Sequence, residues 1–190
     1  MDIMLDIETL GTKPETVILT IGAVKFDPFS NKIGDGLYIK PDVDEQIARG
    51  RDVDESTLAW WGTQAEDVRE EALGMADRIS IEEMYRQLNR FIVGADNVWA
   101  QGPVFDMVIL AHIYRQYGWP TPWQYWQVRD SRTLFGTHGD PRVKGKAGLH
   151  NALEDCISQA QAVQTIYKQL GLKPRDRKST RLNSSHGYIS

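Results

Sequence analysis

Short runs of apolar and β-branched residues dominate the first quarter of the chain. Residues 1–7, 17–26 and 36–40 are rich in strand-forming side chains, and the turn residues of 27–34 separate the last two runs. Runs of this length, joined by short connections, predict three strands that form an antiparallel meander.

Helical and strand-like patterns alternate in the remainder of the chain. Apolar residues at helical spacing predict helices over 80–93, 105–117 and 149–170, and short strand-like runs occupy 97–101 and 125–128. Three strands followed by alternating helices and strands predict an α/β domain with a mixed five-stranded sheet flanked by helices.

Two segments lack a long periodic pattern. Residues 42–79 are polar and predict short helices, one of them beginning at Thr63, because Thr63 and Glu66 have the spacing of a capping box. Residues 136–148 contain four glycines and one proline and predict a loop.

Composition narrows the class of protein. The chain has 190 residues, with 26 acidic and 22 basic side chains and a net charge of −4, so a general electrostatic attraction to nucleic acid is excluded. The single cysteine, Cys156, excludes a disulfide framework and a cysteine-ligated zinc site. No apolar run approaches the roughly 18 residues that cross a bilayer, and the first residues are acidic rather than basic, so we expect a cytoplasmic protein without membrane contact.

The last residues differ from the rest of the chain. Residues from about 176 to 190 are polar and aperiodic, and they resemble the translation of a common sequencing-library adapter. We therefore expect one domain over residues 1–172 and a non-native or disordered tail over 173–190.

Two acidic residues mark the end of the first strand. Asp6 and Glu8 are two positions apart, so their side chains point to the same face of the sheet. Two neighbouring carboxylates repel each other, more strongly when buried, and a divalent cation would relieve that repulsion. A solvated strand end is the simpler interpretation of this pair taken alone.

Further candidate side chains occur in the second half of the chain. Asp106 follows the strand predicted over 97–101 and lies near the start of a helix, where an acidic residue also suits the helix dipole. His150 precedes Asp155 by five positions, so the two side chains leave a helix in different directions and His150 belongs at or before the helix start. Spacing alone does not decide between Glu154 and Asp155.

The order of these residues resembles the DEDDh (DnaQ-like) 3′-5′ exonuclease superfamily, which has a ribonuclease H-like fold. The resemblance covers residues 1–172 and extends to the phage exonuclease-A and bacterial exoribonuclease branch. The segments that carry it are Leu5-Asp6-Ile7-Glu8-Thr9, Phe105-Asp106, His150-Asn151-Ala152-Leu153-Glu154-Asp155, Ser56-Thr57-Leu58-Ala59-Trp60-Trp61 and Arg129-Asp130-Ser131-Arg132-Thr133. The chain departs from many relatives at Gln101-Gly102, where they carry Asn or His.

The resemblance implies phosphodiester hydrolysis with two divalent cations, Mg²⁺ or Mn²⁺. Asp6, Glu8 and Asp155 would hold one ion, Asp6 and Asp106 the other, and His150 would act as the general base. The substrate would be a single-stranded nucleic-acid 3′ end, and the residues expected to contact it are Ile7, Thr9, Leu10, Trp61 and Phe105.

Several interpretations remain open at the level of sequence. The leading hypothesis is a 3′-5′ exonuclease with DNA slightly favoured, and the alternatives are a 3′-5′ exoribonuclease and a catalytically silent nucleic-acid-binding module. Either Trp60 or Trp61 would line the substrate groove, or Trp61 would only cover an apolar patch. The family further implies a bacterial or phage-infected host cytoplasm, and the sequence leaves a homodimer open as one oligomeric state.

Overall fold

A computed structural model describes residues 1–142 and 151–174 of the chain. The expected general base, His150, and residues 175–190 of the expected tail lie outside the described residues. Along the part that is described, none of the helices combines the length and the apolar character needed to cross a membrane.

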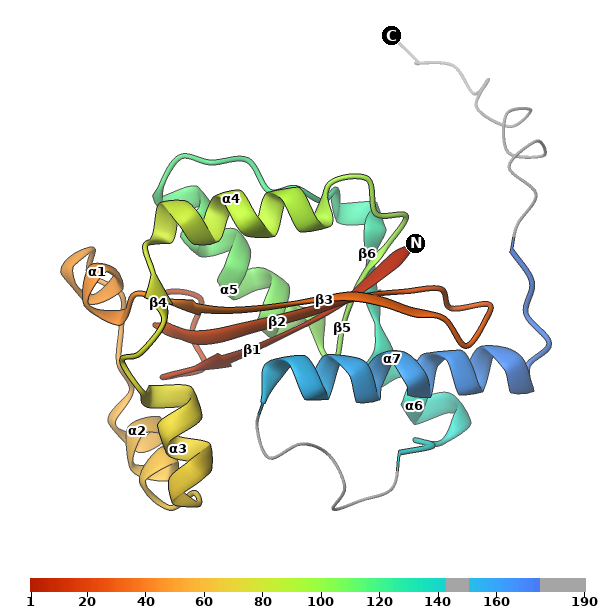
Figure 1. Cartoon of the computed structure of the whole chain (residues 1–190), viewed down its shortest axis with the longest axis horizontal. Helices are drawn as coiled ribbons and strands as arrows, with labels where there is room; N and C mark the ends of the chain where they lie inside the picture. Colours follow the sequence, from red (N-terminus) through yellow and green to blue (C-terminus); the bar gives the residue numbers. More distant parts are fainter. Residues whose placement is uncertain (143–150, 175–190) are drawn as a thin grey trace, which may run out of the picture.

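A mixed sheet forms the centre of the domain (Figure 1). Its strands run in the order β4-β3-β2-β1-β5-β6. The first three pair antiparallel, as the meander prediction requires, and β5 and β6 continue the sheet in parallel with β1. Their bounds are β1 Asp2–Thr9, β2 Ile18–Phe26, β3 Ile33–Pro41, β4 Arg78–Ile79, β5 Val98–Ala100 and β6 Val128–Asp130.

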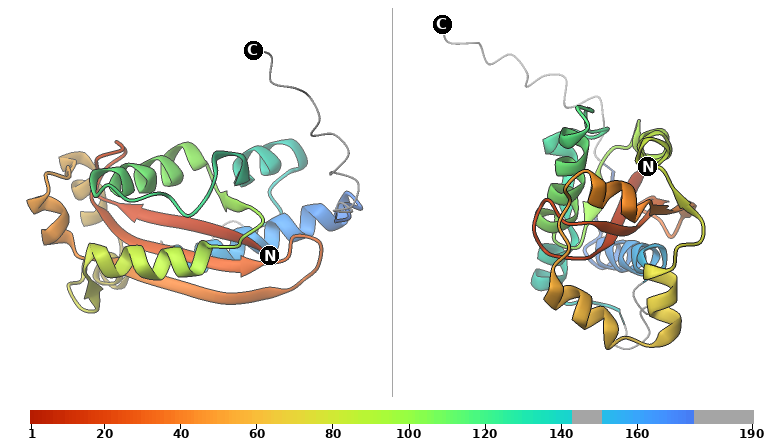
Figure 2. Two further views of the ribbon diagram at one scale, coloured as in Figure 1. Left: turned by 90° about the horizontal axis from the view of Figure 1, so that it is seen from above. Right: turned by 90° about the vertical axis from the view of Figure 1, so that its left-hand side faces the viewer.

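Helices cover both faces of this sheet (Figure 1, Figure 2). On one face lie α4 and α5, on the other lie α6 and α7, and the three short helices α1 to α3 gather near the end of β1. Their bounds are α1 Val43–Ala48, α2 Glu55–Gly62, α3 Glu66–Leu73, α4 Ile81–Ile92, α5 Pro103–Gln116, α6 Ser131–His138 and α7 Ala152–Gln169.

The alternation of side chains along β1 decides which face carries the acidic pair. Ile3, Leu5 and Ile7 pack into the core beneath α4 and α5, whereas Met4 packs into the core beneath α7. Successive side chains of a strand point to opposite faces, so Asp6 and Glu8 share the α7 face with Met4.

The structure corrects four expectations from the sequence. The sheet has six strands rather than five, because the two-residue strand β4 pairs with the end of β3. The strand expected over 125–128 begins only at Val128 and follows a 3₁₀ turn, Tyr125–Gln127. The loop expected from residue 136 begins later, since α6 continues to His138.

The fourth correction concerns the helix expected to begin at Thr63. Thr63 instead ends α2, and its hydroxyl donates to the Trp60 carbonyl oxygen at 2.7 Å. The next helix begins at Glu66, after Ala65, without a side-chain cap. In contrast, α4 begins where the helical pattern predicts it, and the Ser80 hydroxyl caps its first turn by accepting from the Glu83 backbone N–H at 3.2 Å.

Candidate active site

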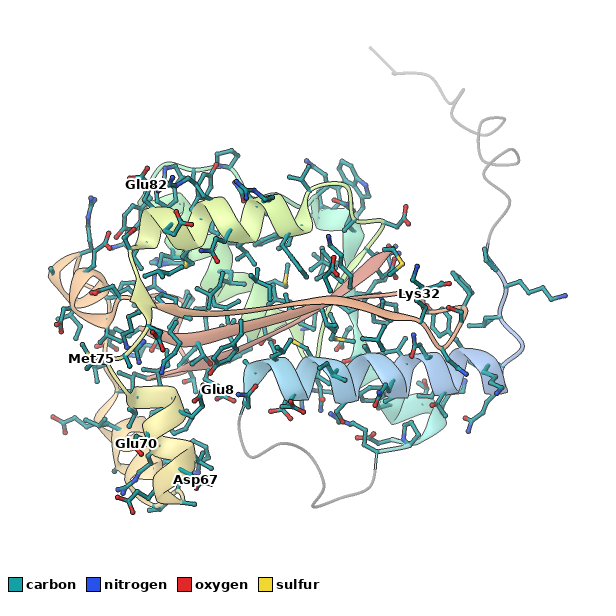
Figure 3. All side chains as sticks on the ribbon, in the orientation of Figure 1. Glu8, Lys32, Asp67, Glu70, Met75 and Glu82 are labelled. Carbon is teal, nitrogen blue, oxygen red and sulfur yellow. The ribbon has the colours of Figure 1, made fainter. Side chains whose placement is uncertain are left out.

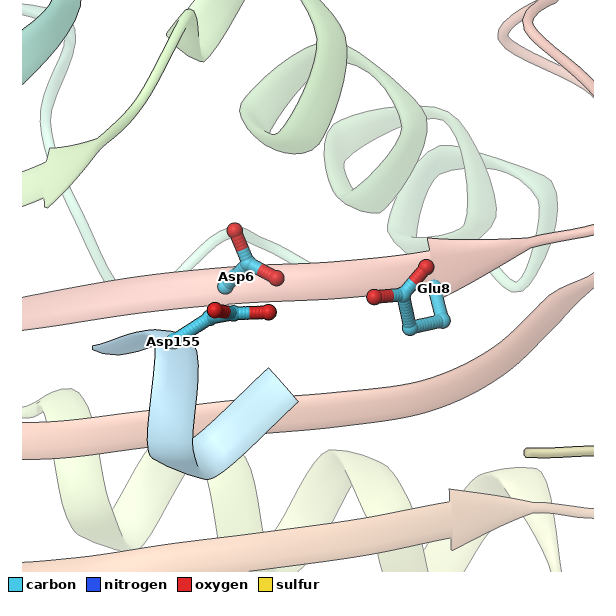
Figure 4. A group of neighbouring side chains, drawn as sticks. All are labelled: Asp6, Glu8 and Asp155. Atoms are coloured by element: carbon cyan, nitrogen blue, oxygen red, sulfur yellow. The ribbon is translucent and has the colours of Figure 1, made fainter. Parts of the chain in front are cut away.

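Three carboxylates meet on the α7 face of the sheet. Asp6 and Glu8 of β1 and Asp155 of α7 each offer one oxygen, and these atoms all lie within 4.8 Å of one another (Figure 4). Glu8 projects beside the first turn of α7 (Figure 3). Residue spacing alone did not decide between Glu154 and Asp155. In the structure Asp155 belongs to the cluster, whereas Glu154 is exposed.

Close packing of α7 against the sheet brings Asp155 to the acidic pair. Gly22 of β2 pairs directly with Asp6. A Cβ atom at this glycine would lie 2.2 Å from the backbone carbonyl carbon and oxygen of Ala152, so only glycine permits the first turn of α7 to approach β2 so closely. Asn151 caps the same turn by accepting from the backbone N–H groups of Leu153 and Glu154 at 3.1 Å.

Asp106 approaches the cluster from the other side of β1. Its side chain is buried at the first turn of α5, and its Oδ1 accepts from the Ile7 backbone N–H at 3.2 Å. Asp106 is not one of the three clustered carboxylates, but its charge acts on Asp6 and raises the pKa of Asp6. Exposed Arg132 lies close enough to oppose burial by lowering the pKa of Asp106.

Burial and mutual repulsion perturb the ionisation of these acids. Burial, with the charges of Asp106 and Glu8, raises the pKa of Asp6 well above its usual value. Burial, followed by the charges of Asp155 and Asp106, raises the pKa of Glu8 to about 8. Burial also raises the pKa of Asp106 to about 7, against the lowering effect of two backbone N–H groups and Arg132.

The carboxylate cluster fits a divalent cation. Its donors are all carboxylate oxygens, the ligand type that Mg²⁺ and Mn²⁺ prefer. Carboxylates gathered and buried in this way repel one another until a positive charge is supplied.

The residues expected to touch substrate are more enclosed than the sequence suggested. Ile7, Thr9 and Leu10 are buried, and Phe105 is half-buried. The backbone N–H and C=O of Leu10 bond to Val17 and Asp54 at 2.9 and 2.8 Å. The Leu10 side chain packs in the apolar cluster beneath α2 and α3.

Trp61 is also placed inside this cluster. It is 1% exposed, and its indole N–H donates to the Thr9 carbonyl oxygen at 2.9 Å. Trp61 thus supports the end of the strand that carries Glu8. The neighbouring Trp60, in contrast, is 43% exposed to solvent.

Three contributors to the site were not assigned from the sequence. Gly22 lies inside a strand-like run, where an isolated glycine is a recognised sign of close backbone approach. Gln159 donates from α7 to Asp6, and no local pattern marks it. Arg132 lowers the pKa of Asp106, and its guanidinium donates to the Gln101 carbonyl oxygen at 2.9 Å.

Comparison with known proteins identifies a family and a relative of this chain. The family described as the 3′-5′ exoribonuclease Rv2179c-like domain matches residues 1–167. An exodeoxyribonuclease of Enterobacteria phage T4 is 24% identical over 159 residues, which cover 70% of this chain and 69% of the phage protein.

Two solved structures illustrate the shared fold. Exonuclease X in complex with 5′-overhanging duplex DNA has a TM-score of 0.52 and 22% identity, covering 91% of this chain and 95% of that chain. Exonuclease I of E. coli, in complex with a dT13 oligonucleotide, has a TM-score of 0.63 and 17% identity, covering 90% of this chain but 42% of that chain. The chain belongs to the Rv2179c-like 3′-5′ exoribonuclease domain family and is a 3′-5′ exonuclease of the DnaQ-like superfamily.

Proposed function

We propose that the chain is a metal-dependent 3′-5′ exonuclease that removes nucleotides from the 3′ end of single-stranded nucleic acid, with DNA slightly favoured. The observation that carries this proposal is the cluster of Asp6, Glu8 and Asp155, whose oxygens lie within 4.8 Å of one another. Two divalent cations, Mg²⁺ or Mn²⁺, would supply an activated water and neutralise charge on the leaving oxygen.

The protein's own groups have distinct tasks in this proposal. Asp6, Glu8 and Asp155 would hold the cation on the nucleophile side, and Asp6 and Asp106 would hold the cation on the leaving-group side. The hydrogen bond from the Ile7 N–H fixes the Asp106 carboxylate at the edge of the cluster. His150 accepts the proton of the attacking water, a task that suits an imidazole with a pKa near ~6.5.

RNA is the second candidate substrate. The family that matches residues 1–167 is described as an exoribonuclease, whereas the phage T4 relative is an exodeoxyribonuclease. Discrimination between the two depends on contacts to the 2′-hydroxyl, and such contacts leave no recognisable motif.

The proposal is tested with 5′-labelled DNA and RNA oligonucleotides of matched sequence, incubated with Mn²⁺, Mg²⁺ or EDTA. We expect a ladder of products that shorten one nucleotide at a time from the 3′ end, dependent on metal and absent for Asp6→Asn. Turnover by Asp6→Asn, or internal cleavage of 3′-blocked strands, would refute the assignment. Binding without turnover would instead identify a silent nucleic-acid-binding module.

A further inference from the structure

A buried glutamine on α7 contacts the central carboxylate of the site. Gln159 is 3% exposed, and its Nε2 donates to Oδ1 of Asp6 at 3.1 Å. Gln159 follows Asp155 by four positions, so both side chains leave the same face of the helix. One face of α7 therefore supplies a carboxylate to the cluster and a hydrogen bond to the neighbouring carboxylate of β1.

The other end of this side chain is unsatisfied. Gln159 Oε1 is buried and has no hydrogen-bond partner within the described part of the chain. A buried carbonyl oxygen without a partner is unfavourable, and an apolar side chain of similar length would avoid that penalty. As far as folding is concerned, the position therefore suits methionine or leucine at least as well as glutamine.

We propose that Gln159 is a positioning residue for Asp6, an inference that rests on the metal-dependent function proposed above. Its N–H group fixes the rotation of the Asp6 carboxylate and so sets where the second carboxylate oxygen points. The amide does this without adding a charge, because it is neutral at every pH. A lysine or arginine in its place would compete electrostatically with the cation that the carboxylates bind.

The position of α7 makes this arrangement rigid. The first turn of α7 packs on Gly22, the residue that pairs with Asp6 across β1 and β2. Asp155 and Gln159 therefore approach Asp6 from a helix whose distance to the sheet is fixed at the same point. Hydrogen bonds from outside the ligand set commonly determine metal affinity in this way.

Gln159→Met tests the proposal, because it keeps the length of the side chain and removes the donor. We expect the dissociation constant for Mn²⁺, measured by calorimetry without nucleic acid, to rise by about 10- to 100-fold. The Mn²⁺ concentration for half-maximal hydrolysis should rise in parallel, while the KM for the oligonucleotide changes by less than about 2-fold. The melting temperature of the metal-free variant should change little, because the substitution removes the unpaired Oε1 atom together with the donor to Asp6.

The same helix offers a matched control. Gln164 is 5% exposed, and its Nε2 donates to the backbone oxygens of Asp27 and Lys32 at 3.0 and 2.9 Å, away from the carboxylates. Gln164→Met should lower the melting temperature, because it leaves buried acceptors unpaired, but it should leave the affinity for Mn²⁺ within about 2-fold of the wild type.

Each outcome separates this inference from the proposed function. Wild-type affinity for Mn²⁺ in Gln159→Met would overturn the positioning role, even if the enzyme is metal-dependent. A wild-type chain that binds no Mn²⁺ and hydrolyses in EDTA would overturn the proposed function itself. If Gln159→Met does not fold, Gln159→Asn, whose shorter amide does not reach Asp6, must show the same weakening, and unchanged affinity there would equally refute the role.

Discussion

The stability of the metal-free protein should fall as the pH rises from about 5 to about 8. In the folded chain the pKa of Glu8 is about 8 and that of Asp106 is about 7, against ordinary values of 4.5 and 3.8. Folding therefore raises both pKa values, and between these limits the folded chain holds more protons than the unfolded chain. The contribution of Glu8 and Asp106 to stability is therefore fully present below their ordinary pKa values and is lost as the pH rises through their raised pKa values.

The expected loss of stability follows from the size of the two pKa shifts. For Glu8 alone, a pKa raised from 4.5 to about 8 corresponds to about 5 kcal/mol. The charge of Asp106 is one of the causes that raise the pKa of Glu8, so the two contributions do not add in full, and screening by water reduces the contribution of the half-buried Glu8 below that value. We expect a combined loss of about 4 kcal/mol, which is about 8–16 °C in melting temperature for a chain of this length.

Thermal unfolding followed by circular dichroism in EDTA, at a series of pH values, measures this loss. Added Mn²⁺ should abolish most of the slope, since the cation binds the ionised carboxylates and stabilises the folded state that contains them. Glu8→Gln removes one titrating group, so its profile should be flatter than that of the wild type in EDTA. A wild-type profile that is level or rises with pH in EDTA would refute the electrostatic reasoning.

Two further substitutions test the packing that supports the site, and a third tests whether two copies associate. Gly22→Ala should force the first turn of α7 away from β2 and displace Asp155, which lowers the free energy of unfolding by about 1–3 kcal/mol and the hydrolysis rate at least about 10-fold. Urea denaturation measures the first effect and the oligonucleotide assay the second. An unchanged hydrolysis rate would show that the close approach of α7 to β2 is dispensable. Trp61→Phe should lower the free energy of unfolding by about 1–2 kcal/mol, because the Thr9 carbonyl loses its donor; stability equal to the wild type in urea would contradict this. If two copies associate through exposed aromatic side chains, Tyr125→Ser, at a side chain that is 85% exposed, should reduce the dimer fraction measured by light scattering, and an unaltered mass would place the interface elsewhere.

Much of the fold could be predicted because its signals are local. Strand-forming runs identified the meander, and apolar residues at helical spacing over 80–93 identified α4. The incorrect predictions occurred where the sequence pattern does not determine the hydrogen-bond partner. The Thr63 hydroxyl donates to the preceding helix, α2, instead of capping the next one, and β4 forms because its two residues lie beside the end of β3. Pairing of this kind leaves no periodic pattern in the sequence.

The site shows the same division. Asp6 and Glu8 were identifiable because their spacing on one strand places them on one face, and Asp155 joins them as the resemblance implied. The hydrogen bond of Gln159 joins it to Asp6, which lies 153 positions away in the sequence, and local sequence patterns cannot predict a contact between such distant residues. The packing of Leu10 beneath α2 and α3 likewise depends on elements that are distant in the sequence, and no local pattern predicts it.

The most direct test of the account is a crystal structure of the protein soaked with Mn²⁺, with anomalous scattering recorded to locate the metal. The account predicts an anomalous peak bounded by Asp6, Glu8 and Asp155, with manganese–oxygen distances of about 2.1 Å. Asp6→Asn should lose or weaken that peak. Manganese bound only elsewhere, with these three carboxylates turned away from one another, would contradict the account.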